Sequence, residues 1–555
     1  MNKLPHRLLV GTAAFAAVMI VASLMNVELD VTPDQRHTLN QSLKDQLVQT
    51  EPLVITVLLD ESVPRSFSTY RTYIDRILAR ARRYQPLIQI EYKNPNEGPP
   101  DEVAAFRKFL GSRGVEPLSR QVQSQDEVSQ SLLYPFVSLQ TVDELLFVDI
   151  LEPRLLTESE ESTLLRSQFS FESKLVRALR SLNQNRLDQV AVLGPKSALI
   201  AEGFNRDSRI SGRKYVNASD GSLLELYTSL DAIIVVTNRD LPRDELVAID
   251  ALASSGVPVV WCVDKFSVTL DSLSDGPYLA TTGQLNLDDY LFNYGVKIEP
   301  ELIQDLSCHT IPQVVGSQGG TAATESLPYP YHLRVVGFDQ GSVLNRFVGE
   351  MHIPYASPIS VRDNQELLKI EPILFSSPNS KTTPSPAILD FGLMTKALEE
   401  ADFGVERLPV GVQLKGIFDP YFGDLRLTDE EQAFRKTIRY DGSRSTTQIV
   451  ISDAQFVTPP QDRNGRYWPA GYNIWDRQMY DANVLWMDQV LESIIHGDEV
   501  IRLRQRRMDV SLVDRSKWRT NINSAIIQIL VLPIAMVIGL YLLTYLYRRH
   551  RYGRA

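Results

Sequence analysis

Asp288 and Asp289 are the side chains whose type and spacing most suggest chemistry, because adjacent carboxylates can act as general acid and base. They follow Asn286, which can N-cap a short helix, and so fall in the first turn of that helix, where the helix dipole favours negative charge. Gly295 is placed to end that helix. We interpret the pair as structural, and we retain Asp288, Asp289 and Tyr294 as candidates for contact with a ligand or partner.

The usual signatures of catalysis, nucleotide binding and metal binding are absent from the sequence. It contains no G-x-x-x-x-G-K-[ST], H-E-x-x-H, C-x-x-C or G-x-S-x-G motif. Cys262, in VVWCVDKF, has no glycine beside it, which favours a buried thiol on a strand over an exposed nucleophile. Cys308, His309, His332 and His352 could converge on a metal, although their spacing is not that of the common ligand sets. We therefore predict that the chain is not an enzyme and has no catalytic residue, cofactor or metal.

The composition is that of a folded, acidic protein. The 555 residues carry a formal net charge of −11 and 43% of them are hydrophobic, enough for two or three domains with proper cores. An acidic body is unsuited to nucleic acid, whose phosphates require a basic surface. The two cysteines, Cys262 and Cys308, permit one disulfide or two thiols, and the sequence favours neither.

Two long stretches without charge lie near the ends of the chain. Residues 525–546 could form a helix across a hydrocarbon core of about 30 Å, and the arginine-rich RRHRYGRA that follows indicates the cytoplasmic side. Residues 8–25 form the second stretch, preceded by Lys3 and Arg7, with a cleaved signal peptide as the alternative. These patterns predict a transmembrane helix at each end, an inner-membrane location, both termini in the cytoplasm and a periplasmic body.

Between these ends, apolar runs alternate with helical patterns, which predicts two α/β domains. The first, 27–152, has a β-α-β order followed by two further strands, as in thioredoxin-like domains. The second, 164–497, repeats short apolar strands from QVAVLG and DAIIVVT through EPILFSS and VGVQLKG to QIVISD. Such strands predict a parallel sheet between helix layers, in a flavodoxin- or amidotransferase-like domain. The predicted fold class is thus α/β with flanking transmembrane helices.

The remaining segments are expected to connect these parts. We predict an N-terminal anchor at 1–26, an acidic linker at 153–163, an insertion at 304–355 within the second domain, a charged helical connector at 498–521, and the second anchor with its basic tail at 522–555. Pro300 and Glu301 are expected to open a helix, and GSQGGTAATES at 316–326 to form a flexible loop. Insertions of this length are usually functional or contact a partner.

Several motifs resemble the gliding-motility-associated GldG family of Bacteroidetes. They include NLDDYLFNYGV at 286–296, DLSCHTIP at 305–312, IDALASSGVPVVWCVD at 249–264 and VQLKGIFDPYF at 412–422. The matches run in order along the chain, so the resemblance covers nearly all of it. Two loops depart from the family's pattern, namely GPKSALIAEG after the first strand of the second domain and ISDAQFV at its last strand.

The resemblance implies an auxiliary, substrate-binding component of an ABC transporter that is associated with gliding motility and protein secretion. The implied partners are a permease subunit (GldF-like) and a separate cytoplasmic ATPase (GldA-like), which agrees with the missing phosphate-binding loop. Further contact candidates are arginines near the two anchors, for which a solvated helix face is the alternative: Arg36, Arg502, Arg504, Arg506 and Arg507.

The alternative function is a glycan- or lipopolysaccharide-binding envelope module. Its ligand would lie in a crevice beyond the carboxyl ends of the parallel strands, after Leu193, Thr237 and Asp264. An open pocket lined there by Trp261 or Tyr278 would favour this function.

Overall fold

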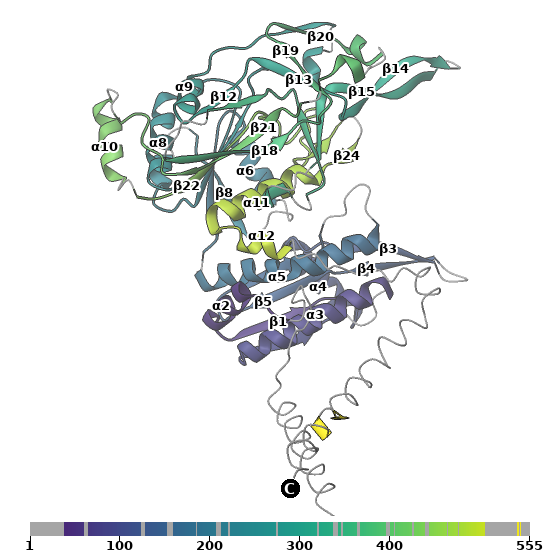
Figure 1. Cartoon of the computed structure of the whole chain (residues 1–555). Helices are drawn as coiled ribbons and strands as arrows, with labels where there is room; N and C mark the ends of the chain where they lie inside the picture. The colour runs from purple at the N-terminus through teal and green to yellow at the C-terminus, as the bar shows by residue number, and fades with distance from the viewer. Residues whose placement is uncertain are drawn as a thin grey trace, which may run out of the picture. The chain divides into compact units, whose positions relative to one another are not determined.

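The structure is a computed structural model that describes residues 38–504, apart from short internal gaps, together with 541, 542, 544 and 545 (Figure 1). Leu39–Arg506 forms one compact unit. This unit contains a four-stranded sheet, a seven-stranded sheet and several smaller sheets. The seven-stranded sheet and the smaller sheets position the candidate site.

The four-stranded sheet has the order β2-β1-β5-β6. β1 (Leu53–Val57) and β2 (Ile88–Tyr92) are parallel, because α3 (Arg65–Tyr84) lies between them in the chain and serves as the crossover that a parallel pair requires. β5 (Phe136–Gln140) is antiparallel to β1, and β6 (Leu145–Asp149) is antiparallel to β5. The element order is the predicted β-α-β unit followed by two strands.

Helices α2 (Gln41–Gln49), α3 and α5 (Glu160–Gln184) bury their apolar faces in one core with this sheet. Asn40 caps α2, as its side chain predicts, because Oδ1 accepts a hydrogen bond of 2.7 Å from the Ser42 N–H. α5 begins at Glu160, so the segment expected as a linker includes its first turn. The other elements of this part are α4 (Pro100–Ser112), β3 (Leu118–Gln123) and β4 (Val128–Leu133).

The seven-stranded sheet has the order β18-β21-β22-β10-β9-β7-β8. Its strands are β7 (Asp188–Leu193), β8 (Arg213–Asn217), β9 (Ala232–Thr237), β10 (Val259–Val263), β18 (Leu368–Phe375), β21 (Pro409–Gly416) and β22 (Thr446–Ile451). β8, β7, β9, β10 and β22 are parallel, as expected. β18 and β21 are antiparallel to their neighbours, so the expectation of a wholly parallel sheet is wrong.

Helices cover both faces of this sheet, which is why its central strands β9 and β10 are buried along their whole length. α6 (Ser197–Arg206) and α11 (Asp481–His496) share a core with one face. α8 (Arg243–Ser254) and α9 (Asn286–Asn293) share a core with the other. The remaining helices near this sheet are α7 (Leu223–Leu226) and α10 (Asp429–Thr437).

Between β10 and β18, the chain forms smaller sheets around their own core. They pair β11 (Tyr278–Ala280) with β20 (Ala387–Leu389), β12 (Val296–Ile298) with β17 (Ile359–Val361), β13 (Glu301–Asp305) with β19 (Ser380–Pro384), and β14 (Cys308–Gln318) and β15 (Thr321–Val336) with β16 (Glu350–Pro354). β23 (Tyr472–Asn473) and β24 (Gln478–Met479) form a further pair.

Two local predictions in this region are wrong. The segment after Pro300 is strand β13, because it pairs with β19 over its whole length. Residues 316–326, expected as a loop, belong largely to the long ribbon of β14 and β15, in which Gln318 pairs with Thr321 (Figure 1). The glycine content suggested a loop, but Gly316 lies within β14.

The predicted transmembrane helices are not supported. The predicted spans, 8–25 and 525–546, lie outside the described residues except for 541, 542, 544 and 545. In the part of the chain that is described, no helix is both long and apolar enough to cross a membrane. The two longest, α3 and α5, carry charges along their whole length, which a hydrocarbon core disfavours. The fold class of the described residues is therefore corrected to mixed α/β, with no helix among them that could span a membrane. The predicted inner-membrane location, with cytoplasmic termini and a periplasmic body, is likewise not supported.

Candidate functional site

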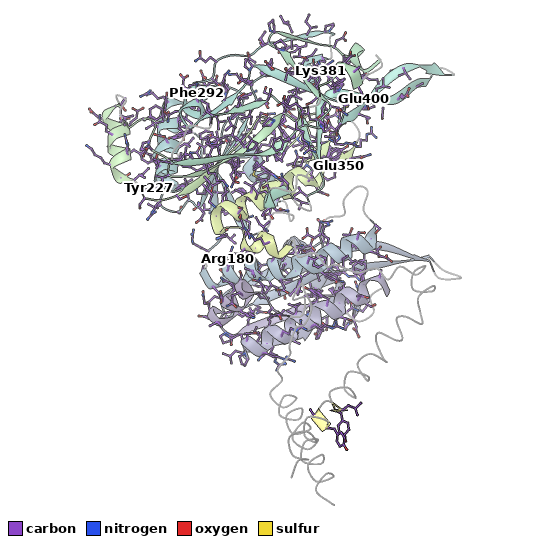
Figure 2. The ribbon with its side chains drawn as sticks, viewed as in Figure 1. Arg180, Tyr227, Phe292, Glu350, Lys381 and Glu400 are labelled. Atoms are coloured by element: carbon purple, nitrogen blue, oxygen red, sulfur yellow. The ribbon has the colours of Figure 1, made fainter. Side chains whose placement is uncertain are left out.

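A pocket beside α9 has the size of a small-molecule site. Its volume is about 440 Å³, within the range of about 300–1,000 Å³ that such sites have. Its apolar wall consists of Leu291, Phe292, Ile298 and Pro300. Its charged groups are Lys265, Lys297, Asp288 and Asp289. Figure 2 labels Phe292 on α9, and 42% of this residue is exposed.

Local hydrogen bonds fix α9, which forms one wall of this pocket. The side chain of Asn286 accepts from the Leu241 N–H at 3.2 Å and donates to the Leu241 carbonyl oxygen at 2.7 Å. The Asn286 N–H donates to Asp240 Oδ1 at 2.8 Å. Gly295 has a φ of 85° after the helix, the left-handed conformation predicted for its end. The helix is thereby attached to the loop after β9.

The two predicted aspartates have different surroundings. Asp288 Oδ2 accepts from the Leu285 N–H at 2.8 Å and lies 2.5 Å from Lys265 Nζ, so this carboxylate closes the helix N-terminus and pairs with a lysine. Asp289 is exposed, lines the pocket, and has no hydrogen bond or ion pair to any described residue. Asp289 is therefore the carboxylate that a ligand can reach.

Tyr294 lies in the core. Only 3% of it is exposed, and its hydroxyl lies 3.0 Å from Asp250 Oδ1 and 2.7 Å from the Asp419 carbonyl oxygen. The buried Asp250 also accepts from the N–H groups of Tyr421 and Phe422, at 3.0 and 3.1 Å. Burial raises the pKa of Asp250. Tyr294 thus positions the loop that follows β21.

The predicted arginines lie at the edge of the described chain or beyond it. Arg502 and Arg504 are on α12 (Glu499–Arg504). The Arg502 side chain is 69% exposed and lies 4.0 Å from Asp498, as on a solvated helix face. Arg36, Arg506 and Arg507 lie outside the described residues, and the side chain of Arg504 is not described.

The crevice beyond the parallel strands is filled at β10 and β22. Asp264 and Asp453 follow these strands, both are buried, and Asp264 Oδ1 accepts from the Ala454 N–H at 2.6 Å. Burial raises the pKa of Asp264 to about 7, and burial together with the neighbouring Asp264 carboxylate raises the pKa of Asp453. Trp261 is fully buried and bonded to Gln448 at 2.8 Å, so it lines no open pocket.

The cysteines are free thiols, which resolves the question that the sequence left open. Cys262 is buried on β10, and burial raises its pKa, which makes it unsuited to act as a nucleophile. Cys308 is half-buried, and burial raises its pKa to about 11.

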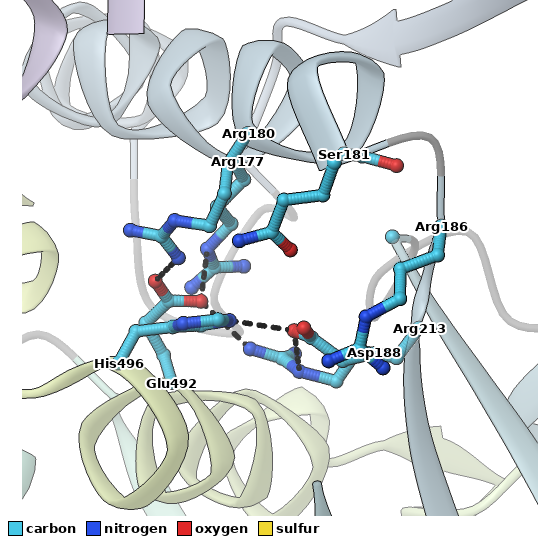
Figure 3. A pocket seen from close by; sticks show the side chains of 10 residues that line it. Arg177, Arg180, Ser181, Arg186, Asp188, Arg213, Glu492 and His496 are labelled. Atoms are coloured by element: carbon cyan, nitrogen blue, oxygen red, sulfur yellow. Dashed lines mark hydrogen bonds and ion pairs between the residues drawn. The ribbon is translucent and has the colours of Figure 1, made fainter. Parts of the chain in front are cut away.

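A cluster of buried ion pairs joins α5, β8 and α11 (Figure 3). Arg180 Nη1 lies 2.9 Å from Glu492 Oε1, and Arg213 Nη2 lies 2.7 Å from Glu492 Oε2. Arg177 Nη1 and Arg213 Nη1 lie 2.8 and 2.5 Å from Asp488. The cavity among these side chains is only about 20 Å³, the size of a single water. The cluster therefore holds elements together, and a larger ligand does not fit.

Three histidines from neighbouring strands come together, as the sequence allowed. His352 Nε2 lies 3.1 Å from His332 Nδ1, and the ring centroids of His309 and His352 are 4.5 Å apart. Burial lowers the pKa of His309 to about 4, that of His332 to about 3, and that of His352 well below its usual value. Among the described residues, no group of three or more histidines, cysteines or carboxylates could hold a metal ion.

Comparison with known proteins places the pocket in a family segment. Residues 213–488 match the family described as "ABC-type uncharacterized transport system", and residues 33–140 match a "Domain of unknown function (DUF7088)". No curated protein matches the chain. Among solved structures, the "mmIFT52 N-terminal domain" is similar over 56% of this chain and 98% of its own, with 8% identity and a TM-score of 0.28. A likeness this low carries no weight for fold or function.

The first match spans the chain from β8 into α11 and includes α9, the pocket and the small sheets. The ATP-binding motif is missing from the sequence, as expected of a subunit that is not the ATPase. Residues 213–488, just under half of the chain, are thus similar to auxiliary proteins of ABC-type transport systems.

Proposed function

We propose that the chain is a non-enzymatic, substrate-binding auxiliary component of an ABC transporter that serves gliding motility and protein secretion. It works with a GldF-like permease and a GldA-like ATPase, and the ATPase supplies the phosphate-binding motif that this sequence lacks. The observation that carries the proposal is the match of residues 213–488 to the auxiliary family, because the same segment contains a pocket of ligand size.

The motifs that resemble the gliding-motility family support the finer assignment. NLDDYLFNYGV, at 286–296, forms α9 and the start of β12, and it supplies Asp288, Asp289, Leu291 and Phe292 to the lining of the pocket. Some of the residues that carry the resemblance are therefore ones that a bound substrate would contact. We assign cargo contact to this pocket, with Asp289 as its accessible charge.

Filling the pocket tests this assignment. Gly283 lines the pocket, and a Cβ added there would have no atom within 4 Å. Gly283→Trp is expected to change the free energy of unfolding by less than about 0.5 kcal/mol, as exposed substitutions do, and to abolish function in a complementation assay. Gly111→Trp is the matched control, because that glycine on α4 also faces open space. Normal function of Gly283→Trp would exclude the pocket as the cargo site.

Deleting the gene tests the biological role. The deletion strain is expected to lose gliding and secretion to the same degree as a strain without the ATPase, and a plasmid copy of the wild-type gene is expected to restore both. Spreading on agar and the amount of secreted protein measure the two phenotypes. A deletion strain that glides and secretes normally would contradict the role in motility and secretion. The association with transporter subunits would then be tested separately by a binding experiment.

The glycan-binding alternative lacks a specific supporting observation. Trp261 is buried, and Asp264 is covered where the sugar would lie. Tyr278 is half-buried on β11, and its hydroxyl lies 3.5 Å from the Ser267 carbonyl oxygen. The open pocket that would favour this alternative is thus not formed by these residues.

A further inference from the structure

The second half of helix α3 is strongly basic in a chain that is acidic overall. α3 carries six arginines and one aspartate, whereas the whole chain has a net charge of −11. Four of the arginines fall within the last two turns and a half, and we call them the basic end of α3: Arg76, Arg80, Arg82 and Arg83. A concentration of one sign of charge on one element creates a local field that attracts the opposite charge.

The fold directs these arginines outward. The opposite side of α3 is buried against the four-stranded sheet through Tyr70, Ile74 and Ile77, at helical spacing. Arg76, Arg82 and Arg83 are consequently exposed, and Arg80 is half-buried. Arg76 and Arg82 have no ion pair or hydrogen bond to other described residues.

Exposed apolar side chains adjoin the basic end. Gln85, directly after α3, donates to the Thr50 carbonyl oxygen at 2.6 Å, so the carboxyl ends of α2 and α3 lie together. Val48 is 70% exposed, Tyr84 is 47% exposed and Leu87 is 59% exposed at this place. The surface therefore combines cationic groups with exposed aliphatic and aromatic side chains.

The acidic groups nearby are few and partly occupied. Asp75 pairs with Arg71 at 3.0 Å and accepts from the Tyr92 hydroxyl at 3.0 Å. Asp45 on α2 accepts from Gln41 at 2.7 Å. Glu51 and Glu91 are the exposed carboxylates of the adjoining segments, and Lys44 lies 5.4 Å from the Tyr84 ring centroid on the same side. The four arginines and Lys44 outnumber these carboxylates, so the end of α3 stays cationic.

We propose that the basic end of α3, with Val48, Tyr84 and Leu87, binds the surface of an anionic phospholipid bilayer. Guanidinium groups bind phosphate in a bidentate manner, and tyrosine and aliphatic side chains enter the boundary between headgroups and acyl chains. A nucleic-acid backbone would use the arginines but gain nothing from Val48 and Leu87. The combination of arginines with exposed apolar side chains therefore favours a lipid surface over a nucleic acid as the partner. The protein would bind this surface without crossing the bilayer.

Vesicle flotation tests the proposal with the full-length chain. Vesicles of phosphatidylcholine alone are compared with vesicles containing 30% phosphatidylglycerol (about the anionic fraction needed for a surface potential). The wild type is expected to prefer the anionic vesicles. Each arginine near such a surface contributes about fivefold in partitioning, so Arg76→Gln with Arg82→Gln is expected to lower binding to anionic vesicles about 25-fold and to leave binding to neutral vesicles unchanged. Higher salt is expected to weaken only the anionic component.

The matched control removes two exposed arginines elsewhere, Arg206→Gln with Arg466→Gln, and is expected to bind like the wild type. Circular dichroism melting checks that both double variants fold. Equal binding of the wild type to the two kinds of vesicle, or an equal loss in the control, would overturn the proposal. Arginine-dependent binding to polyglutamate without a preference for anionic vesicles would assign the surface to an acidic protein instead.

Discussion

Glu492→Ala in the full-length chain is expected to lower the free energy of unfolding by about 3–5 kcal/mol at pH 7. Glu492 is 1% exposed and lies within 3.0 Å of nitrogens of Arg177, Arg180 and Arg213. Removing this carboxylate takes away the acidic partner of Arg180 and leaves Asp488 as the partner of both Arg177 and Arg213. The cost of a buried charge that loses its partner exceeds the value of any single hydrogen bond.

The pKa of Glu492 agrees with this role. Burial alone would raise it, but the guanidinium groups of Arg177, Arg213 and Arg180 hold it at about 2. A carboxyl whose pKa is lower in the folded chain than in the unfolded chain contributes stability above its unfolded pKa, and this contribution is lost as the pH falls toward 2. Urea denaturation at pH 7, followed by circular dichroism, measures the effect where the contribution is complete.

A surface ion pair of the same chemistry is the control. Glu202 lies 2.5 Å from Arg206, and the two side chains are 57% and 78% exposed. Glu202→Ala is expected to cost less than about 1 kcal/mol. A double-mutant cycle that combines Glu492→Ala with Arg180→Ala separates the energy of the Glu492–Arg180 pair from that of the rest of the cluster. If Glu492→Ala costs no more than Glu202→Ala, the cluster does not hold α5 to α11.

Acidification from pH 6.5 to pH 5 is expected to destabilise the chain through its three buried histidines. Each of these imidazoles must remain neutral in the folded state, because burial lowers the pKa of His309 to about 4 and that of His332 to about 3. In the unfolded chain each regains a pKa of about 6.5 and takes up a proton. The contribution of each neutral histidine to the free energy of unfolding is therefore fully present above pH 6.5. Below that pH the contribution is lost, by about 2 kcal/mol per histidine at pH 5.

Other charges near the histidines do not remove this effect. The three rings contact one another, Tyr329, Tyr355 and Tyr480, and the charged group that acts on them is Arg334, which lowers the pKa of His309 further. Asp264 acts in the opposite direction, because its pKa of about 7 makes the folded state gain stability on acidification. The pH dependence of the wild-type free energy of unfolding is therefore smaller than the histidine contribution. Variants are required to measure that contribution.

The variant His332→Phe isolates the contribution. The difference in free energy of unfolding between wild type and His332→Phe is expected to fall by about 2 kcal/mol between pH 6.5 and 5. Tyr329→Phe keeps the ring next to His332 and all three histidines, so its difference from the wild type is expected to be independent of pH over this range. A pH-independent difference for His332→Phe would show that the buried histidine is not neutral in the folded chain.

Local signals in the sequence predicted the elements, whereas their long-range pairing was not predictable. Asn40 before α2 and Gly295 after α9 act on their own neighbours, so their sequence context is sufficient. The sequences of β18 and β21 predict strands but not their direction, which is set by pairing with segments far along the chain. Residues 316–318 and 321–326 have no alternating apolar pattern, so their pairing in β14 and β15 was not predictable from the local sequence.

The candidate site was predicted only in part for the same reason. Asp288 and Asp289 were found because they form a local pattern, but Lys265 joins them from another loop. Arg177 lies 311 residues from Asp488, so no local pattern links them. A usable signal was present in WMDQVLESI, where Asp488 and Glu492 lie four residues apart on an otherwise apolar helix. Buried carboxylates of this kind require cationic partners.

The most direct test of the central claim is affinity purification of the tagged full-length chain, with quantitative mass spectrometry of the proteins that are recovered. The account predicts that an ABC permease and its ATPase are recovered in a fixed ratio to the chain, and that Gly283→Trp recovers the same amounts, because the pocket binds cargo and not the transporter. Recovery of the chain without either transporter subunit, under conditions where a tagged ATPase recovers its permease, would contradict the assignment to an ABC transport complex.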